Sequence, residues 1–143
     1  ILKKELTLIP IFGWYLKKIG SISIKRNKFT RDNLSFFFDI KKIIQNTERP
    51  LIIFPQGTRV NVDDRTPFKK GAMRIYENLK IKCQPIAINS GSVWPKIGNL
   101  KSNKKVIISI LEPIDSNLDS QHFIKRLEEK IYKELDQMNS NLS

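Results

Sequence analysis

A short apolar run that ends in a proline and a polar loop constrains the fold of this 143-residue chain more than any other feature. The run, Leu51–Phe54, is rich in β-branched residues and predicts a buried strand. Pro55 would end that strand because its nitrogen has no hydrogen to donate. Gly57 permits a tight turn, and Arg59 offers a planar fork of donors suited to phosphate or carboxylate.

This loop has two interpretations. In open α/β sheets, ligands bind at the carboxyl ends of the strands, so Thr58 and Arg59 would form part of an anion-binding site there. The plain alternative is a strand followed by a turn that simply faces solvent. The pattern of residues alone does not separate the two.

Helix and strand patterns alternate along the rest of the chain. Apolar residues at helical spacing predict helices at about 12–19, 30–46, 68–79 and 119–138. Alternating or short apolar runs predict strands at 21–25, 84–89 and 105–111. This order predicts one α/β domain, residues 1–143, with a mixed, largely parallel central sheet flanked by helices. The side chains that share the expected inner faces of the helices are Leu34, Phe37, Phe38, Lys41 and Ile44; Ala72, Ile75, Tyr76 and Leu79; and Phe123, Ile124, Leu127, Ile131, Leu135 and Met138.

The composition of the chain bears on its partners and its compartment. The chain has 26 basic and 14 acidic residues and a net charge of +12, which favours lipid headgroups, nucleic acid or an acidic protein. Cys83 is the only cysteine, so an internal disulfide is impossible and a reducing compartment is the simplest expectation. No apolar run approaches the ~20 residues that a membrane-spanning helix needs.

Two further segments have alternative interpretations. The run Leu6–Ile19 is either an ordinary buried helix or a membrane-surface element, with Trp14 and Tyr15 at headgroup level and lysines nearby. Arg26 follows the predicted strand at 21–25 and has lysines on both sides. These cations form either a candidate phosphate site or a solvated strand end.

Phe54–Arg59 resembles the Phe-Pro-Glu-Gly-Thr-Arg block of the glycerolipid acyltransferases, specifically the 1-acyl-sn-glycerol-3-phosphate acyltransferases. Gln56 departs from that block, which usually has Glu, and Lys25 replaces the acid of a degenerate upstream block that ends in Arg26. The other blocks of the family occur in the expected order. They are represented by Lys3, Glu5, Leu6, Pro10, Gly13 and Trp14; by Gly20, Ile24 and Arg26; by Lys70, Gly71 and Ala72; and by Pro85, Ile86 and Ile88.

The resemblance implies a glycerol-3-phosphate acyltransferase-like fold and an activity. A fatty acyl group would move from acyl-CoA or acyl carrier protein to lysophosphatidic acid, giving phosphatidic acid in phospholipid biosynthesis. It implies no metal, no cofactor and no nucleic-acid partner, and it places the protein at the cytoplasmic face of an anionic membrane, in bacteria the inner membrane. The implied phosphate-binding residues are Arg26, Gln56, Gly57, Thr58 and Arg59, and the implied acyl-side residues are Pro85, Ile86 and Ile88.

The catalytic base of the family is the histidine of a His-x4-Asp motif, and this chain does not contain that motif. Its one histidine, His122, is expected to be a surface or helix-cap residue. We therefore expect the motif upstream of Ile1 and expect the 143 residues to be inactive alone. The alternative is a non-catalytic basic module that binds lipid or nucleic acid, although the basic residues are scattered and no RNA-binding signature is present.

Overall fold

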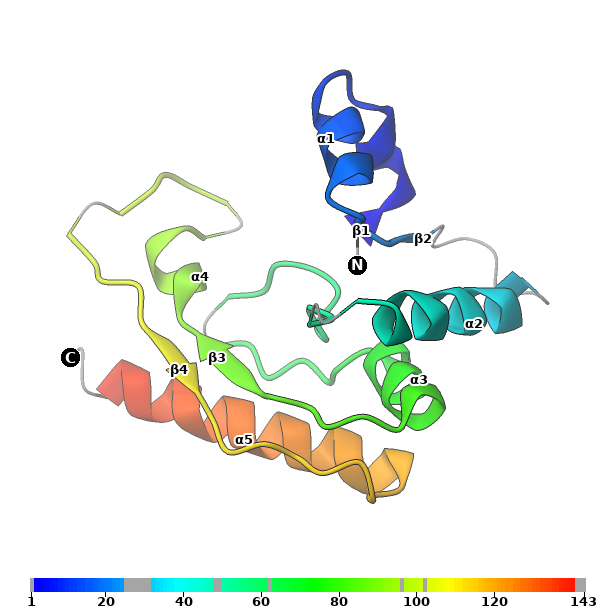
Figure 1. Cartoon of the computed structure of the whole chain (residues 1–143). Coiled ribbons are helices and arrows are strands. Elements are labelled where there is room, and N and C mark those ends of the chain that lie inside the picture. Colours follow the sequence, from blue (N-terminus) through cyan, green and yellow to red (C-terminus); the bar gives the residue numbers. More distant parts are fainter. Residues whose placement is uncertain are drawn as a thin grey trace. The chain divides into compact units, whose positions relative to one another are not determined.

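The computed structural model describes residues 2–24, 32–47, 50–61, 63–95, 97–101 and 103–140. The chain forms two compact units, residues 1–53 and residues 54–143. Figure 1 shows the first unit in blue to cyan and the second in green to red.

In the N-terminal unit, a short parallel strand pair frames a helical hairpin. Strand β1 (Leu2–Lys3) pairs in parallel with β2 (Ser23–Ile24). Between the two strands lie the 3-10 helix η1 (Lys4–Leu8) and the helix α1 (Phe12–Lys18). The longer helix α2 (Asp32–Gln45) follows. These elements confirm the predicted helices at 12–19 and 30–46 and the predicted strand at 21–25, although that strand has only two residues.

The hairpin between η1 and α1 depends on a glycine. A Cβ atom at Gly13 would overlap the backbone carbonyl of Thr7, so a larger residue would push η1 and α1 apart. The N–H of Gly13 donates to the carbonyl oxygen of Ile9 at 2.7 Å, which closes the turn. At the tip, Ile11 has a φ of 64°, an unusual conformation for a β-branched residue. The hairpin leaves large apolar side chains exposed, among them Leu8, Ile9, Ile11, Phe12, Trp14 and Tyr15.

Helix α2 buries a face that overlaps the predicted one, because Ile40 lies one turn from both Phe37 and Ile44, which are half-buried. Ile40 is fully buried, whereas Phe38 is exposed and Phe37 is only half-buried. The side chain of Leu34 lies outside the described part of the chain. Apolar residues occur around most of the circumference of this helix, so periodicity alone could not select the buried face.

The C-terminal unit is a helical layer on a two-stranded sheet. Strand β3 runs antiparallel to β4, with Ile86 opposite Ile110, Ala87 opposite Ser109 and Ile88 opposite Ile108. Figure 1 shows the long α5 running alongside this pair. The elements are α3 (Lys70–Leu79), β3 (Ile86–Ile88), the one-turn helix α4 (Ser90–Val93), β4 (Ile108–Ile110) and α5 (Ser120–Ser140).

The core of this unit lies between α3, β3 and α5. Tyr76 stacks on Phe123, with ring centroids 3.6 Å apart, and the Tyr76 hydroxyl donates to the backbone carbonyl of Asp115. Ala87 is fully buried in the same core. The predicted buried faces of α3 and α5 are confirmed, apart from Ile124, which is half-buried at the edge of the core.

The expected central strand is not assigned. In the described range 50–61, Leu51–Phe54 carries no regular secondary structure, and the side chains of Ile52 and Phe54 are 65% and 73% exposed. Pro50 and Pro55 bracket this segment, and neither can donate a backbone hydrogen bond. An apolar run favours an extended backbone, but a strand also needs partners that the local sequence does not specify. The largely parallel sheet therefore stays a prediction.

Candidate functional site

The predicted phosphate loop begins with a tight turn that requires glycine. Gly57 has a φ of 69°, in the left-handed region, and its N–H donates to the carbonyl oxygen of Phe54 at 3.0 Å. A Cβ atom placed on Gly57 would lie 3.2 Å from Cγ of Lys69. The turn and the residue that precedes α3 are therefore in close contact.

A backbone hydrogen bond fixes that contact. The N–H of Lys69 donates to the carbonyl oxygen of Pro55 at 2.8 Å. Lys69 is the N-cap of α3 and Lys70 its first residue; both side chains are exposed, and the first turn of α3 has no acid. The positive end of the α3 dipole and two lysines thus lie at the turn that leads to Arg59, an arrangement that favours anions.

Gln56 has a structural partner on α5. Its side chain hydrogen-bonds the Tyr132 hydroxyl. That hydroxyl in turn donates to the backbone carbonyl of Thr66. Burial raises the pKa of the Tyr132 phenol, and the bond from Gln56 opposes this rise. Because the phenol uses its one proton on Thr66, Gln56 must act as the donor, through its amide NH₂ group.

The rest of the loop is held by the same helix. Arg65 forms an ion pair with Asp136, and its guanidinium carbon lies 5.2 Å from the centroid of the Tyr132 ring. The N–H of Phe68 donates to the side chain of Glu128, and the Phe68 and Tyr132 ring centroids are 5.3 Å apart. Helix α5 therefore anchors both ends of the segment from Gln56 to Phe68.

Thr58 and Arg59, the two residues expected to bind the phosphate directly, are both exposed. The guanidinium carbon of Arg59 lies 5.7 Å from the centroid of the Trp94 ring, within the range of a cation–π contact. Such a contact with a ring face consumes no N–H donor. The N–H groups of the guanidinium therefore remain able to donate hydrogen bonds to an anion from solvent.

The three predicted acyl-side residues do not share one environment. Pro85 is fully buried, whereas Ile86 and Ile88 point outward from β3 and are largely exposed. Their cross-strand partners on β4, Ile110 and Ile108, are exposed as well. The strand predicted at 84–89 is confirmed over Ile86–Ile88, but only one face of β3 is buried, through Ala87, and the other is an open apolar surface.

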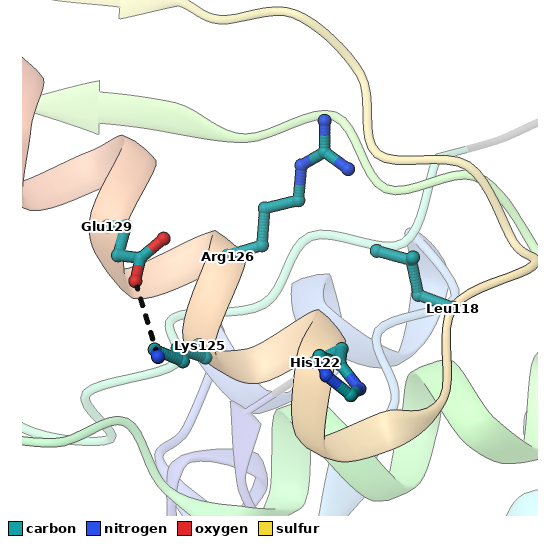
Figure 2. Close-up of a pocket in the computed structure, with 5 residues that line it drawn as sticks. All are labelled: Leu118, His122, Lys125, Arg126 and Glu129. Atoms are coloured by element: carbon teal, nitrogen blue, oxygen red, sulfur yellow. Dashed lines mark ion pairs between the residues drawn. The ribbon is translucent and has the colours of Figure 1, made fainter.

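Arg26 and His122 are the two remaining residues to place. Arg26 lies outside the described residues, so its place in the site stays a prediction. His122 is exposed at the start of α5 and pairs through Nδ1 with Asp119, which agrees with the expected surface position. Figure 2 shows His122 with Leu118, Lys125, Arg126 and Glu129 around a shallow surface hollow that contains none of the predicted site residues.

Sequence reasoning missed Tyr132 as a partner of the loop. It is separated from Gln56 by most of the C-terminal unit, and no local pattern signals contact over that distance. The contact of Trp94 with Arg59 likewise joins two segments far apart in the sequence, and no local pattern predicts it. Among the described residues, no group of three or more metal-ligating side chains is found.

Comparison with known proteins indicates the family of this chain. The model of the family described as Acyltransferase matches residues 1–89. A 1-acyl-sn-glycerol-3-phosphate acyltransferase of Helicobacter pylori is 34% identical over 137 residues, covering 94% of this chain and 56% of that protein. Its counterpart in Pseudomonas aeruginosa is 33% identical over 104 residues, covering 68% of this chain and 38% of that protein. The chain thus spans roughly half the length of these curated relatives.

A solved structure shows the same fold. The crystal structure of the 1-acyl-sn-glycerophosphate (LPA) acyltransferase, PlsC, from Thermotoga maritima superposes with a TM-score of 0.76 at 23% identity. The superposition covers 96% of this chain and 55% of that one. Together with the family model, which matches more than half of the residues, these findings show that the chain belongs to the Acyltransferase family.

Proposed function

We propose that this chain is part of an enzyme that transfers a fatty acyl group to lysophosphatidic acid and so makes phosphatidic acid. The observation that carries the proposal is the loop Phe54–Arg59, which is held by α5 and lies against the start of α3. The names of the relatives, which are 1-acyl-sn-glycerol-3-phosphate acyltransferases, support the choice of substrate.

The loop would bind the phosphate of the acceptor. Arg59 would supply charge-assisted hydrogen bonds, and the Thr58 hydroxyl would add another donor. The lysines at the start of α3 would lower the cost of bringing a phosphate with up to two negative charges to this turn. Gly57 and Gln56 would act indirectly, because they set the path of the backbone and its attachment to Tyr132. Arg26 belongs to the proposal as a second phosphate ligand.

The chemistry is acyl transfer from a thioester. The free hydroxyl of lysophosphatidic acid would attack the thioester carbonyl of acyl-CoA or acyl carrier protein; a carbon–oxygen bond forms and the carbon–sulfur bond breaks. A base must take the hydroxyl proton, which ends on the departing thiol. His122 is exposed, pairs with Asp119 and lies away from the loop in sequence, so we assign the base to a His-x4-Asp block outside these 143 residues.

The acyl side of the site is proposed to use the outward face of β3. Ile86 and Ile88 offer aliphatic surface without polar groups, which suits a hydrocarbon chain. Pro85, which is buried, would contribute to the shape of the strand start and would not contact the chain directly. No metal or cofactor takes part in this proposal.

The proposed location is the cytoplasmic face of an anionic membrane, where the acceptor lipid resides. The hairpin of the N-terminal unit supports this assignment, because it exposes Trp14 and Tyr15 beside cations. Nζ of Lys18 lies 4.8 Å from the centroid of the Trp14 ring. Trp and Tyr with nearby lysines are typical of the membrane–water interface. Within the described ranges, no helix combines the length and the apolar character required to cross a bilayer.

An acceptor series tests the proposal. The full-length protein would be assayed with a radiolabelled acyl thioester and either lysophosphatidic acid or its dephosphorylated counterpart, monoacylglycerol. We expect phosphatidic acid from the first acceptor and little acyl transfer to the second, because only the first offers a phosphate to Arg59. Equal rates with both acceptors would contradict a phosphate-binding role for the loop.

The competing function is a basic binding module without catalysis. It predicts no product with any acceptor and a strong dependence of nucleic-acid binding on salt. Its specific support is the net charge of +12. Binding of the protein to vesicles and to duplex RNA at matched ionic strength would separate the two: steeply salt-dependent RNA binding without lipid preference would favour the module.

A further inference from the structure

We infer that Trp94, Ile97 and Leu100, on the segment called here the 94–105 loop, insert into the surface of an anionic lipid bilayer beside the candidate phosphate site. The inference deepens the proposed function and rests on it for the biological reason to bind lipid. Binding itself is a separate property that can be measured without turnover. The loop belongs entirely to the C-terminal unit and connects α4 to β4.

The loop has a fixed neck and an apolar tip. The N–H of Lys101 donates to the carbonyl oxygen of Val93 at 2.9 Å, and Val93 itself is buried. Beyond this neck, the chain projects away from α5 (Figure 1). Three large apolar side chains are exposed to solvent there: Trp94, Ile97 and Leu100, with exposed fractions of 62%, 87% and 64%.

The charge of the surrounding segment has one sign. There is no acidic residue between Glu77 and Glu112. Lys101, Lys104 and Lys105 follow the apolar tip and are all exposed, and none of the three forms an ion pair within the described ranges. A run of lysines next to an exposed apolar tip has the composition expected of an interfacial lipid-binding element.

The chemistry of the tip favours lipid over nucleic acid. Single-stranded nucleic acids are bound mainly through aromatic stacking and cationic grooves. Ile97 and Leu100 cannot stack on bases or form hydrogen bonds with them. Their transfer from water to acyl chains is favourable, because it removes apolar surface from water. Trp94 suits the headgroup region, where its indole N–H keeps a polar partner.

This placement has a consequence for the site. Trp94 contacts Arg59, so insertion of the tip would hold the Arg59 guanidinium at about headgroup depth. The phosphate of a lysophosphatidic acid molecule that remains in the bilayer lies at that depth. The loop would thus align the acceptor phosphate with its ligand without extracting the acyl tail from the membrane.

A site-specific dye tests insertion directly. In the 143-residue chain with Cys83→Ser, Ile97→Cys would be labelled with an environment-sensitive fluorophore; Lys133→Cys, exposed on α5, would be the matched control. Vesicles of phosphatidylcholine with phosphatidylglycerol would be added, with and without lipids brominated on the acyl chains. We expect a blue shift and quenching by bromine at position 97 and neither at position 133.

The outcome at position 97 decides the inference. An emission spectrum that does not change when the protein is bound to vesicles would overturn it, because the loop would then stay in water. A protein that binds vesicles and shows the shift at position 97 but makes no phosphatidic acid at full length would keep the loop assignment and overturn the proposed function. A protein that binds duplex RNA but not vesicles would overturn the loop assignment.

Charge reversal provides a second test that does not depend on labelling. Replacement of Lys101, Lys104 and Lys105 with Glu should lower the partition coefficient onto anionic vesicles by at least ~100-fold, since each lysine contributes about fivefold near such a surface. Matched reversal of Lys125, Arg126 and Lys133, which are exposed on α5, should have a much smaller effect, because the loop projects away from that helix (Figure 1). Equal losses in the two triple variants would show that only net charge matters.

Discussion

Arg59 and Trp94 are 35 residues apart in the sequence, yet the guanidinium carbon of Arg59 lies 5.7 Å from the centroid of the Trp94 ring. The contact joins the turn that follows Pro55 to the loop that follows α4. It gives a long, exposed side chain a preferred position without using any of its N–H donors. Binding of an anion to Arg59 would therefore lose less side-chain entropy than binding to a freely moving arginine.

Trp94→Ala should weaken binding of the acceptor more than it slows the chemical step. A cation–π contact at an exposed site contributes about 0.5–1 kcal/mol, so we expect KM for lysophosphatidic acid to rise roughly two- to fivefold in the full-length enzyme. Trp94→Phe keeps an aromatic ring, so its KM should lie between those of Trp94→Ala and the wild type. Steady-state kinetics in detergent micelles, which remove bilayer insertion from the comparison, would measure this effect. An unchanged KM would show that the ring does not position Arg59.

Gln56→Glu should destabilise the C-terminal unit, although it would restore the acid of the block that Phe54–Arg59 resembles. The Tyr132 hydroxyl already donates its proton to the carbonyl of Thr66, so a carboxylate at position 56 would face an oxygen without a donor. We expect a loss of about 1–2 kcal/mol in the free energy of unfolding, measured by urea denaturation.

Tyr132→Phe supplies the control for that change. In the Tyr132→Phe background, Gln56→Glu should lower the free energy of unfolding much less, because the Tyr132 hydroxyl oxygen is absent. The coupling free energy from this double-mutant cycle should be about 1 kcal/mol. Additive effects in the cycle would contradict the hydrogen bond between Gln56 and Tyr132.

Asp119 caps α5 and should stabilise it in a manner that depends on pH. Its Oδ1 accepts hydrogen bonds from the N–H groups of Gln121 and His122, each at 3.0 Å. The backbone hydrogen bond from His122, followed by the bond to its side chain, holds the pKa of Asp119 below its usual value. A carboxyl with a lowered pKa in the folded state stabilises the protein above its unfolded pKa and loses that effect as pH falls through the folded pKa.

Thermal unfolding should therefore distinguish two substitutions at this position. Asp119→Ala should lower Tm at pH 7, and the difference from wild type should shrink as pH falls below about 4. Asp119→Asn keeps an oxygen acceptor for the cap but loses the charge, so its Tm should lie between the other two at pH 7. A Tm difference between Asp119→Ala and wild type that does not vary with pH would contradict a charged cap.

Leu127→Ala tests the core beneath the candidate site. Leu127 is buried on the face of α5 that packs on β3 and α3, and removal of its side chain should lower the free energy of unfolding by about 2–5 kcal/mol. Lys133→Ala, on the exposed face of the same helix, should change it by less than about 0.5 kcal/mol. Similar losses in both variants would mean that the buried face of α5 has been misassigned.

The sequence predicted helices correctly where apolar residues form a single stripe along one face. Helix α5 has a single apolar stripe and a capping Asp119, so its start and its buried face follow from the residues themselves. Helix α3 is similar, with an apolar face at clear helical spacing. In these segments, local propensity and the tertiary environment favour the same face.

The sequence was insufficient where the outcome depends on distant partners. Leu51–Phe54 has the composition of a strand, but a strand also requires neighbours, and composition does not supply them. Within the candidate site, the sequence indicated Gly57 and Arg59 because glycine and arginine have distinctive physical roles. It did not indicate Tyr132, whose hydroxyl acts only because the fold brings α5 to the loop. Helix α2 is apolar on several sides, so its spacing did not identify Ile40 as the buried residue.

The measurement that tests the central claim most directly is the effect of Arg59→Ala on kcat/KM for lysophosphatidic acid in the full-length enzyme. Arg126→Ala, a substitution of another exposed arginine in the same unit, is the matched control. If Arg59 binds the acceptor phosphate, the loss should be about 2–4 kcal/mol of transition-state stabilisation, or roughly 30- to 900-fold, whereas the control should stay near wild type. A loss of less than about tenfold for Arg59→Ala would contradict the account.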